Sequence, residues 1–275
     1  MNHVRYWLML AVLSLILASG IPVLTQESDE IPQVLVEAIA EGFTISETIP
    51  EGVVAIIFQN NAEEPIYASF MSLNEGATPE EFAEAFNAGP QEFLLLASIK
   101  GSILAEPGTS AEAILDFAPG EHVLLDEDNI EMRGTTPFTV ADEEGDGAAE
   151  PQADVTVGLT DFGFNVPPAI PAGPQLWHVQ NLSQETPHEL LIARLDDDMP
   201  AGAVNEILLG HRGMEGVTEV PTIVLGMSEG EQFWVTYDLE PGTYALVCFL
   251  PDIFGSGMPH ALLGMHQIIL VVEAE

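Results

Sequence analysis

The chain contains two copies of one sequence pattern, and this internal repeat limits the possible folds more than any other feature. When residue 33 is placed on residue 154, residues 33–60 align without a gap with residues 154–181. The identical pairs include Val34/Val155, Val36/Val157, Gly42/Gly163, Phe43/Phe164, Ile49/Ile170, Pro50/Pro171, Gly52/Gly173, Gln59/Gln180 and Asn60/Asn181. With a shift of one position, residues 116–122 also align with residues 238–244. Similarity at a fixed spacing indicates two homologous units in tandem.

Within these units, short segments with a period of two predict β-strands. The clearest are residues 154–159, 175–181, 232–239, 243–249 and 266–272. One helix per unit is also predicted. The first begins at Thr78, where Pro79 suits the first helical position and Glu81 completes a capping box, and its counterpart begins near Pro200. We therefore expect an all-β protein of two Greek-key β-sandwich domains, each with one short helical insertion.

An acidic stretch rich in Gly, Ala and Pro separates the units. Residues 141–153 read ADEEGDGAAEPQA, which predicts a solvated linker. The first domain then covers residues 33–140 and the second covers residues 154–275.

The charge balance excludes one class of partner. The 275 residues include 44 Asp+Glu and only 5 Lys+Arg, which gives a formal net charge of −39. Proteins bind nucleic acids through Lys and Arg side chains that displace counterions from the phosphates. We therefore expect no nucleic-acid partner, and we expect cations or basic proteins to be attracted instead.

The N-terminus has the pattern of an export signal. Arg5 precedes an apolar run over residues 6–18, and small residues follow where a signal peptidase could cut. The run is short for a membrane span. We predict a signal peptide at residues 1–20 and an exported protein, located in the periplasm, at the cell surface or outside the cell. An uncleaved N-terminal anchor is the alternative.

The second unit contains residues suited to binding a transition metal. His188 follows the strand that ends at Asn181, and Cys248 ends a G-x-Y-x-x-x-C strand. His260 and Met265 come next, with the spacing H-x4-M. In these motifs the chain resembles the cupredoxins, the family of type 1 or blue copper domains. The resemblance implies two cupredoxin-like domains and one type 1 copper, whose ligands are His188, Cys248, His260 and Met265.

Copper chemistry explains these residue types. Two imidazoles and a thiolate accept both Cu(I) and Cu(II), and a weak thioether ligand tunes the reduction potential. Eleven residues separate Cys248 from His260, more than in small blue copper proteins, and Met258 is an alternative axial ligand. The other interpretation is a metal-free domain in which Cys248 is a core residue and both histidines form hydrogen bonds.

The first unit lacks these ligands. The repeat places Ile66, Asp126 and Thr135 at the positions of His188, Cys248 and Met265, and only Ile130 lies near the position of His260. We expect a metal-free copy that acts as a packing partner, cover or docking surface. The run Asp126, Glu127 and Asp128 is interpreted as a solvated turn rather than a hard-cation site.

The resemblance favours an electron carrier over an enzyme. Multicopper oxidases and copper nitrite reductases are built from similar repeats but need a second copper centre, usually supplied by histidines that flank the type 1 cysteine. Here the flanking residues are Val247 and Phe249, and no His-x-His pair occurs. The alternatives are a metal-free binding or structural module at the cell surface, or a copper carrier.

In that family, redox partners dock on an apolar patch around the exposed second histidine. The resemblance implies this role for the apolar loop around His260, with His260 as the exit for the electron and a basic protein as a plausible partner. The scattered histidines His178, His211 and His266 are expected to lie on strands or on the surface, and the first unit offers only His122. The glycosylation motif at Asn181 is expected to serve a turn instead.

Overall fold

The structure is a computed structural model that describes residues 31–127, 129–142, 148–184, 186–200, 202–220 and 226–273. The expected signal peptide, residues 1–20, lies outside these residues. The first unit consists of β1 (Gln33–Ile39), β2 (Gly42–Thr44), β3 (Thr48–Ile49), β4 (Gly52–Asn60), β5 (Ile66–Leu73), β6 (Ala97–Ala105), β7 (Ser110–Phe117), β8 (Gly120–Asp126) and β9 (Thr135–Val140). The second repeats this order as β10 (Val155–Thr160), β11 (Gly163–Asn165), β12 (Ala169–Pro171), β13 (Gly173–Asn181), β14 (Leu191–Leu195), β15 (Val217–Val220), β16 (Gln232–Leu239), β17 (Gly242–Val247) and β18 (His266–Val272).

Helices occupy equivalent places in the two units. In the first unit, α1 (Pro79–Ala88) and α2 (Pro90–Phe93) lie between β5 and β6. In the second unit, α4 (Ala203–Leu208) lies between the equivalent strands β14 and β15. One-turn helices, α3 (Ile130–Arg133) and η1 (His260–Leu263), precede the last strand of each unit. The predicted capping box of α1 is confirmed: the Thr78 hydroxyl accepts a hydrogen bond from the Glu81 N–H, and the Glu81 carboxylate accepts one from the Thr78 N–H.

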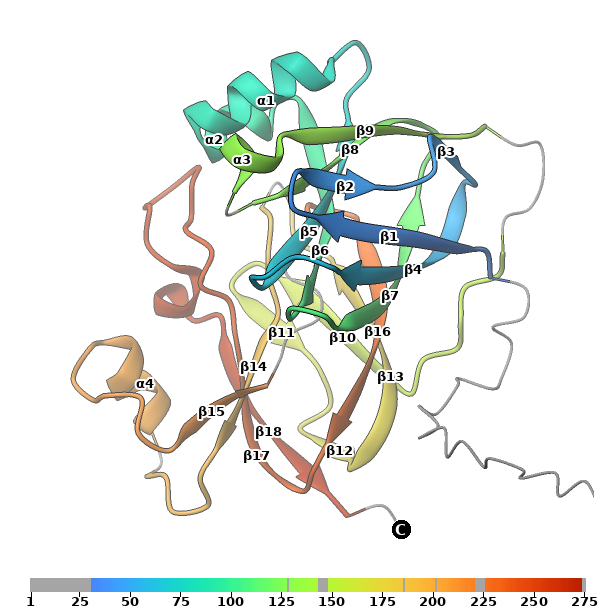
Figure 1. Cartoon of the computed structure of the whole chain (residues 1–275). Coiled ribbons are helices and arrows are strands. Elements are labelled where there is room, and N and C mark those ends of the chain that lie inside the picture. Colours follow the sequence, from blue (N-terminus) through green and yellow to red (C-terminus); the bar gives the residue numbers. More distant parts are fainter. Residues whose placement is uncertain are drawn as a thin grey trace, which may run out of the picture.

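Each unit is a sandwich of two sheets, as predicted. One sheet of each unit has the order β3-β9-β8-β5-β6 or β12-β18-β17-β14-β15. The other two sheets join edge to edge through β7 and β16, which are equivalent strands of the repeat, and form one eight-stranded sheet. These strands pair antiparallel, with Leu115 opposite Phe233 and Ile114 opposite Trp234 (Figure 1). The two units therefore share a backbone hydrogen-bonded sheet.

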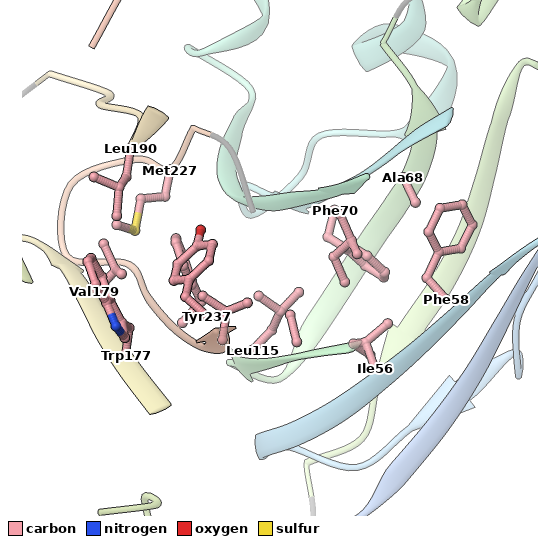
Figure 2. Close-up of a cluster of buried hydrophobic side chains, with 14 of the residues drawn as sticks. Ile56, Phe58, Ala68, Phe70, Leu115, Trp177, Val179, Leu190, Met227 and Tyr237 are labelled. Atoms are coloured by element: carbon pink, nitrogen blue, oxygen red, sulfur yellow. The ribbon is translucent and has the colours of Figure 1, made fainter. Parts of the chain in front are cut away.

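The hydrophobic core is continuous between the units. Alternate residues of β1 are buried, as the period of two requires, and include Val34 and Val36. Figure 2 shows the core extending from Phe58 and Phe70 in the first unit to Tyr237 and Trp177 in the second. Because both units contribute apolar side chains to this shared core, we expect each unit to stabilise the other.

Polar contacts and the linker also join the units. Lys100 forms an ion pair with Glu231, with an N–O distance of 2.5 Å, and the Ile99 N–H donates to the Ser228 hydroxyl at 2.9 Å. At one end of the 141–153 segment, Ala148 and Ala153 pack against the cluster around Trp234. Residues 148–153 are exposed or half-buried, so this end of the linker is in part solvated and in part packed against that cluster. No helix among the described residues is long and apolar enough to cross a bilayer.

Candidate metal centre

The buried side chain of Asn181, at the end of β13, organises the turn that leads to His188. The Asn181 side-chain amide donates hydrogen bonds to the Thr186 and Met227 carbonyls, at 2.9 and 3.0 Å. The His188 backbone then forms an isolated β-bridge with Met227, in which each N–H donates to the other's carbonyl. Because its amide is buried and fully engaged, Asn181 serves the turn as expected, and His188 is fixed at the end of the sandwich.

The Cys248–Met265 segment is held together by backbone hydrogen bonds. The Ala261 N–H donates to the Cys248 carbonyl at 2.7 Å, and the Cys248 N–H donates to the Met265 carbonyl at 3.2 Å. The long insertion folds back on itself through a bridge between Pro251 and Pro259. Its length therefore does not move His260 away from Cys248, even though eleven residues lie between them in the sequence.

A glycine lets the chain pass from the one-turn helix η1 into β18. Gly264 has a φ of 116°, in the region that residues with a side chain rarely adopt. The Met265 N–H then donates to the His260 carbonyl at 2.9 Å. This turn brings two of the predicted ligands into one backbone hydrogen-bonded unit.

Three of the four predicted ligand residues converge on one point. The Nδ1 atoms of His188 and His260 lie 3.1 Å apart, and the Cys248 Sγ lies 3.4 Å from the His260 Nδ1 and 4.0 Å from the His188 Nδ1. All three residues are fully buried. Metal–imidazole and metal–thiolate bonds are about 2.0–2.1 Å and about 2.3 Å long in comparable sites. One ion can satisfy all three bond lengths within this triangle, so the donor atoms fit a single soft or borderline metal.

Met265 is also fully buried and belongs to the same core cluster as Cys248. The alternative axial residue, Met258, is 42% exposed. Burial therefore favours Met265 for the fourth position.

The electrostatic surroundings keep the metal-free side chains neutral. Burial, with a smaller contribution from the neighbouring His260, lowers the pKa of His188 to about 4. Burial also lowers the pKa of His260 and raises the pKa of the Cys248 thiol to about 12. Both imidazoles are thus available as ligands at neutral pH, whereas the thiol loses its proton only when a cation stabilises the thiolate.

Glu189 supports this cluster and was not identified from the sequence. Its backbone N–H donates to the Cys248 Sγ at 3.5 Å, and its carboxylate accepts from the Phe249 N–H at 2.6 Å. Burial raises its pKa, and the N–H groups of Phe249 and Leu250 oppose the rise. Glu189 thereby links the two segments that carry the ligands. An acidic residue directly after a candidate ligand and before an apolar run was the available signal.

Phe162 covers the centre and was also missed. Its ring contacts the His260 ring edge-on, with centroids 5.1 Å apart and an interplanar angle of 72°. Its φ of 58° makes it the single non-glycine residue with positive φ among the described residues, a conformation that costs about 1–2 kcal/mol. His260 is fully buried, so the expectation of an exposed second histidine is wrong. One neighbour of the His260 ring is Phe162 in the β10–β11 turn, which the sequence did not place beside the ligand loop.

The first unit has an ion pair where the second has the metal cluster. Arg133 Nε donates to the Asp126 carboxylate at 2.8 Å, and both side chains are almost completely buried. Arg133 also donates to the Ile39 and Ala40 carbonyls and pairs with Glu64. The prediction of a solvated turn is therefore wrong for Asp126, because Arg133 offsets the cost of burying its charge.

The next residue of the acidic run, Glu127, is exposed, as a solvated turn predicts. The Glu127 carboxylate accepts hydrogen bonds from the Ser69 and Ser102 hydroxyls, at 2.5 and 2.7 Å. Asp128 lies outside the described residues.

The other histidines have separate surroundings. His122 is buried, and its Nε2 lies 3.0 Å from the Ala118 carbonyl. His178 stacks on Trp234 with centroids 4.3 Å apart, His211 lies near Glu206, and His266 Nδ1 lies 3.1 Å from the Ala261 carbonyl. Within the described ranges, His188, Cys248 and His260 form the one group of three or more His, Cys, Asp or Glu residues whose ligand atoms could hold a metal ion.

Comparisons with known proteins complete the description of the site. No protein-family model and no curated protein matches the sequence. The chain is similar to the reduced auracyanin of Roseiflexus castenholzii, with 18% identity and a TM-score of 0.29, over 42% of this chain and 94% of that one. It is also similar to auracyanin A of Chloroflexus aurantiacus, a blue copper protein, with 20% identity and a TM-score of 0.30, over 40% of this chain and 98% of that one. The similarity to the copper nitrite reductase of Nitrosomonas europaea has 13% identity and a TM-score of 0.27, over 87% of this chain and 93% of that one. At these TM-scores, the similarities carry no argument about the activity of this chain.

Proposed function

We propose that the second unit binds one copper ion through His188, Cys248 and His260, with Met265 as a weak axial ligand, and that the protein transfers single electrons between partner proteins. The observation that supports this proposal is the convergence of two imidazole nitrogens and the one thiol of the chain on a buried point. Bound copper would supply the one-electron couple, because two nitrogens and a thiolate suit both of its oxidation states.

The protein's own groups would prepare the site. His188 and His260 are neutral at physiological pH and need no proton release before they bind. The Cys248 thiol gives up its proton on binding, and the Glu189 N–H is placed to donate to the resulting thiolate. Full burial of the three residues excludes water, and backbone hydrogen bonds hold both segments. A fixed and dry ligand set suits electron transfer because little has to move between oxidation states.

We favour an electron carrier over an oxidase or reductase. Such enzymes need a second copper centre near the first, and Val247 and Phe249 flank Cys248 where histidines usually supply it. The first unit contributes packing rather than ligands in this proposal, since Asp126 and Arg133 pair with each other.

Export and the partner are part of the same proposal. The signal-like pattern of residues 1–20 would direct the protein out of the cytoplasm. The strongly negative chain would attract a basic redox partner, and the exposed Phe249, Phe254 and Met258 of the ligand loop give it an apolar surface on which to dock.

Copper loading of the purified protein tests the proposal. We expect one copper per chain, an intense visible thiolate-to-copper band in the oxidised form, and reversible one-electron reduction. Cys248→Ala should abolish the band, whereas His178→Ala, which changes a histidine outside the cluster, should retain it. A colourless protein that binds no copper would contradict the proposal and favour a metal-free module. Bound copper that cannot be oxidised and reduced reversibly would favour a copper carrier.

A further inference from the structure

The orientation of His260 depends on packing at its outer side. Its Nδ1 faces Cys248 and His188, but its Nε2 is buried and has no hydrogen-bond partner among the described residues. A metal-binding histidine usually donates its second N–H to an acceptor that fixes the ring. The His260 ring has instead an edge-on contact with the Phe162 ring.

The turn that carries Phe162 lies close to the ligand loop without being tied to it. A Cβ added to Gly264 would lie 3.7 Å from the Phe162 carbonyl oxygen, so the two segments are neighbours. Yet within the part of the chain that the structure describes, no hydrogen bond joins residues 161–163 to residues 260–264. The contact is made by apolar groups, and Phe162 adopts an unfavourable backbone conformation to make it.

The first unit provides an internal comparison. Glu41 is exposed at the position of Phe162, and the equivalent turn is fixed by Arg133, which donates to the Ile39 and Ala40 carbonyls. In the second unit, Leu263 takes the place of Arg133 and can form no such bonds. The turn of the second unit therefore lacks the hydrogen bonds that Arg133 provides in the first unit, and the Phe162 ring contacts the ligand segment instead.

We infer that Phe162 is a positioning residue for His260 and that its ring contact slows the release of a bound metal ion from the centre. This inference rests on the proposed metal binding. The ring can rotate about its own side-chain bonds without breaking a hydrogen bond, because none joins it to residues 260–264 of the described chain. With Phe162 in place, the ring shields His260 from water and from competing ligands.

The test measures the release of Cu(I) from the loaded full-length protein into an excess of a chromogenic Cu(I) chelator. Phe162→Ala should release copper about tenfold faster than the unchanged protein, because the aromatic contact that holds His260 is lost. Phe162→Leu should fall between the two because it restores part of the cover. Glu41→Ala, the matched change in the first unit, should leave the rate unchanged.

A second measurement uses the metal-free protein. NMR signals of the His260 ring should broaden or average in Phe162→Ala and remain sharp in Glu41→Ala, because only the first change frees the ring. Equal release rates and equal ring signals in all variants would overturn the inference while leaving copper binding intact. Absence of copper binding in the unchanged protein would instead overturn the proposed function and the release mechanism with it.

Discussion

The two units have the same order of elements before their last strand, but different side chains fill the sandwich there. In both, a strand leads to a one-turn helix, then to a glycine with positive φ, Gly134 or Gly264, and then to the last strand of the sandwich. The first unit fills this end with the Asp126–Arg133 ion pair, and the second fills it with Cys248 and two histidines. The fold therefore does not depend on the metal-binding residues, which are a local feature of one copy.

A second position shows the reverse, a shared contact kept by different residues. Tyr244 donates its hydroxyl to the Glu240 carbonyl at 2.9 Å, and in the first unit His122 places its Nε2 3.0 Å from the Ala118 carbonyl. The repeat aligns both donors and both acceptors. This contact closes the same corner in each unit, so it belongs to the fold rather than to the site.

The largest expected effect comes from breaking the ion pair of the first unit. Arg133→Leu, which introduces the residue found at the equivalent position of the second unit, removes the cation that pairs with the buried Asp126 carboxylate. We expect a loss of about 3–5 kcal/mol in the free energy of unfolding, measured by urea denaturation.

The control for this change is Arg194→Leu. Arg194 pairs with Glu240 in an exposed position, where water screens both charges, so Arg194→Leu should lower the free energy of unfolding far less. Similar losses in both variants would show that Asp126 and Arg133 do not hold the first unit as the comparison implies.

The stability that comes from the corner contact of the first unit, made by His122, should depend on pH. Burial lowers the pKa of His122 from 6.5 to about 4, so between these values the unfolded chain binds a proton that the folded chain excludes. The stability from neutral His122 is present above pH 6.5 and is lost as the pH falls to about 4, which amounts to about 3 kcal/mol.

His122→Tyr, which copies the second unit, should remove this part of the acid sensitivity. The measurement is the free energy of unfolding of the metal-free protein at pH 7 and near pH 4, for both proteins. Other buried histidines titrate equally in both, so the difference between the proteins reports His122. An unchanged acid sensitivity in the variant would contradict the assignment.

The smallest effect concerns the helical insertions. Helix α1 has the Thr78 capping box, whereas α4 begins at Gly202 without a side-chain cap. Thr78→Ala should cost about 1 kcal/mol in the free energy of unfolding, because an N-terminal N–H of the helix loses its partner. Thr78→Ser keeps the hydroxyl and should cost little; an equal loss in both variants would exclude capping as the cause.

Local sequence patterns were enough to predict the repeat, the strands, the Thr78 cap and the order of the candidate ligands. These features depend on neighbouring residues and on a period of two along each strand, so the printed sequence contains them directly. The four ligand types in one unit and their absence from the other also followed from alignment of the two copies. The prediction that His188, Cys248 and His260 can meet needed only the strand order that the resemblance implied.

Contacts between distant segments decided the rest. The edge-to-edge pairing of β7 with β16 depends on which strand edges are left open, and alternating residues do not record this. Phe162 contacts His260 from a distant turn, and Arg133 pairs with the buried Asp126, a pairing that the charge of an acidic turn did not suggest. The sequence by itself determined which residues are available for a metal centre, whereas the tertiary structure decided which of them are enclosed. Enclosure arises from packing between elements, and that packing is set by the whole fold.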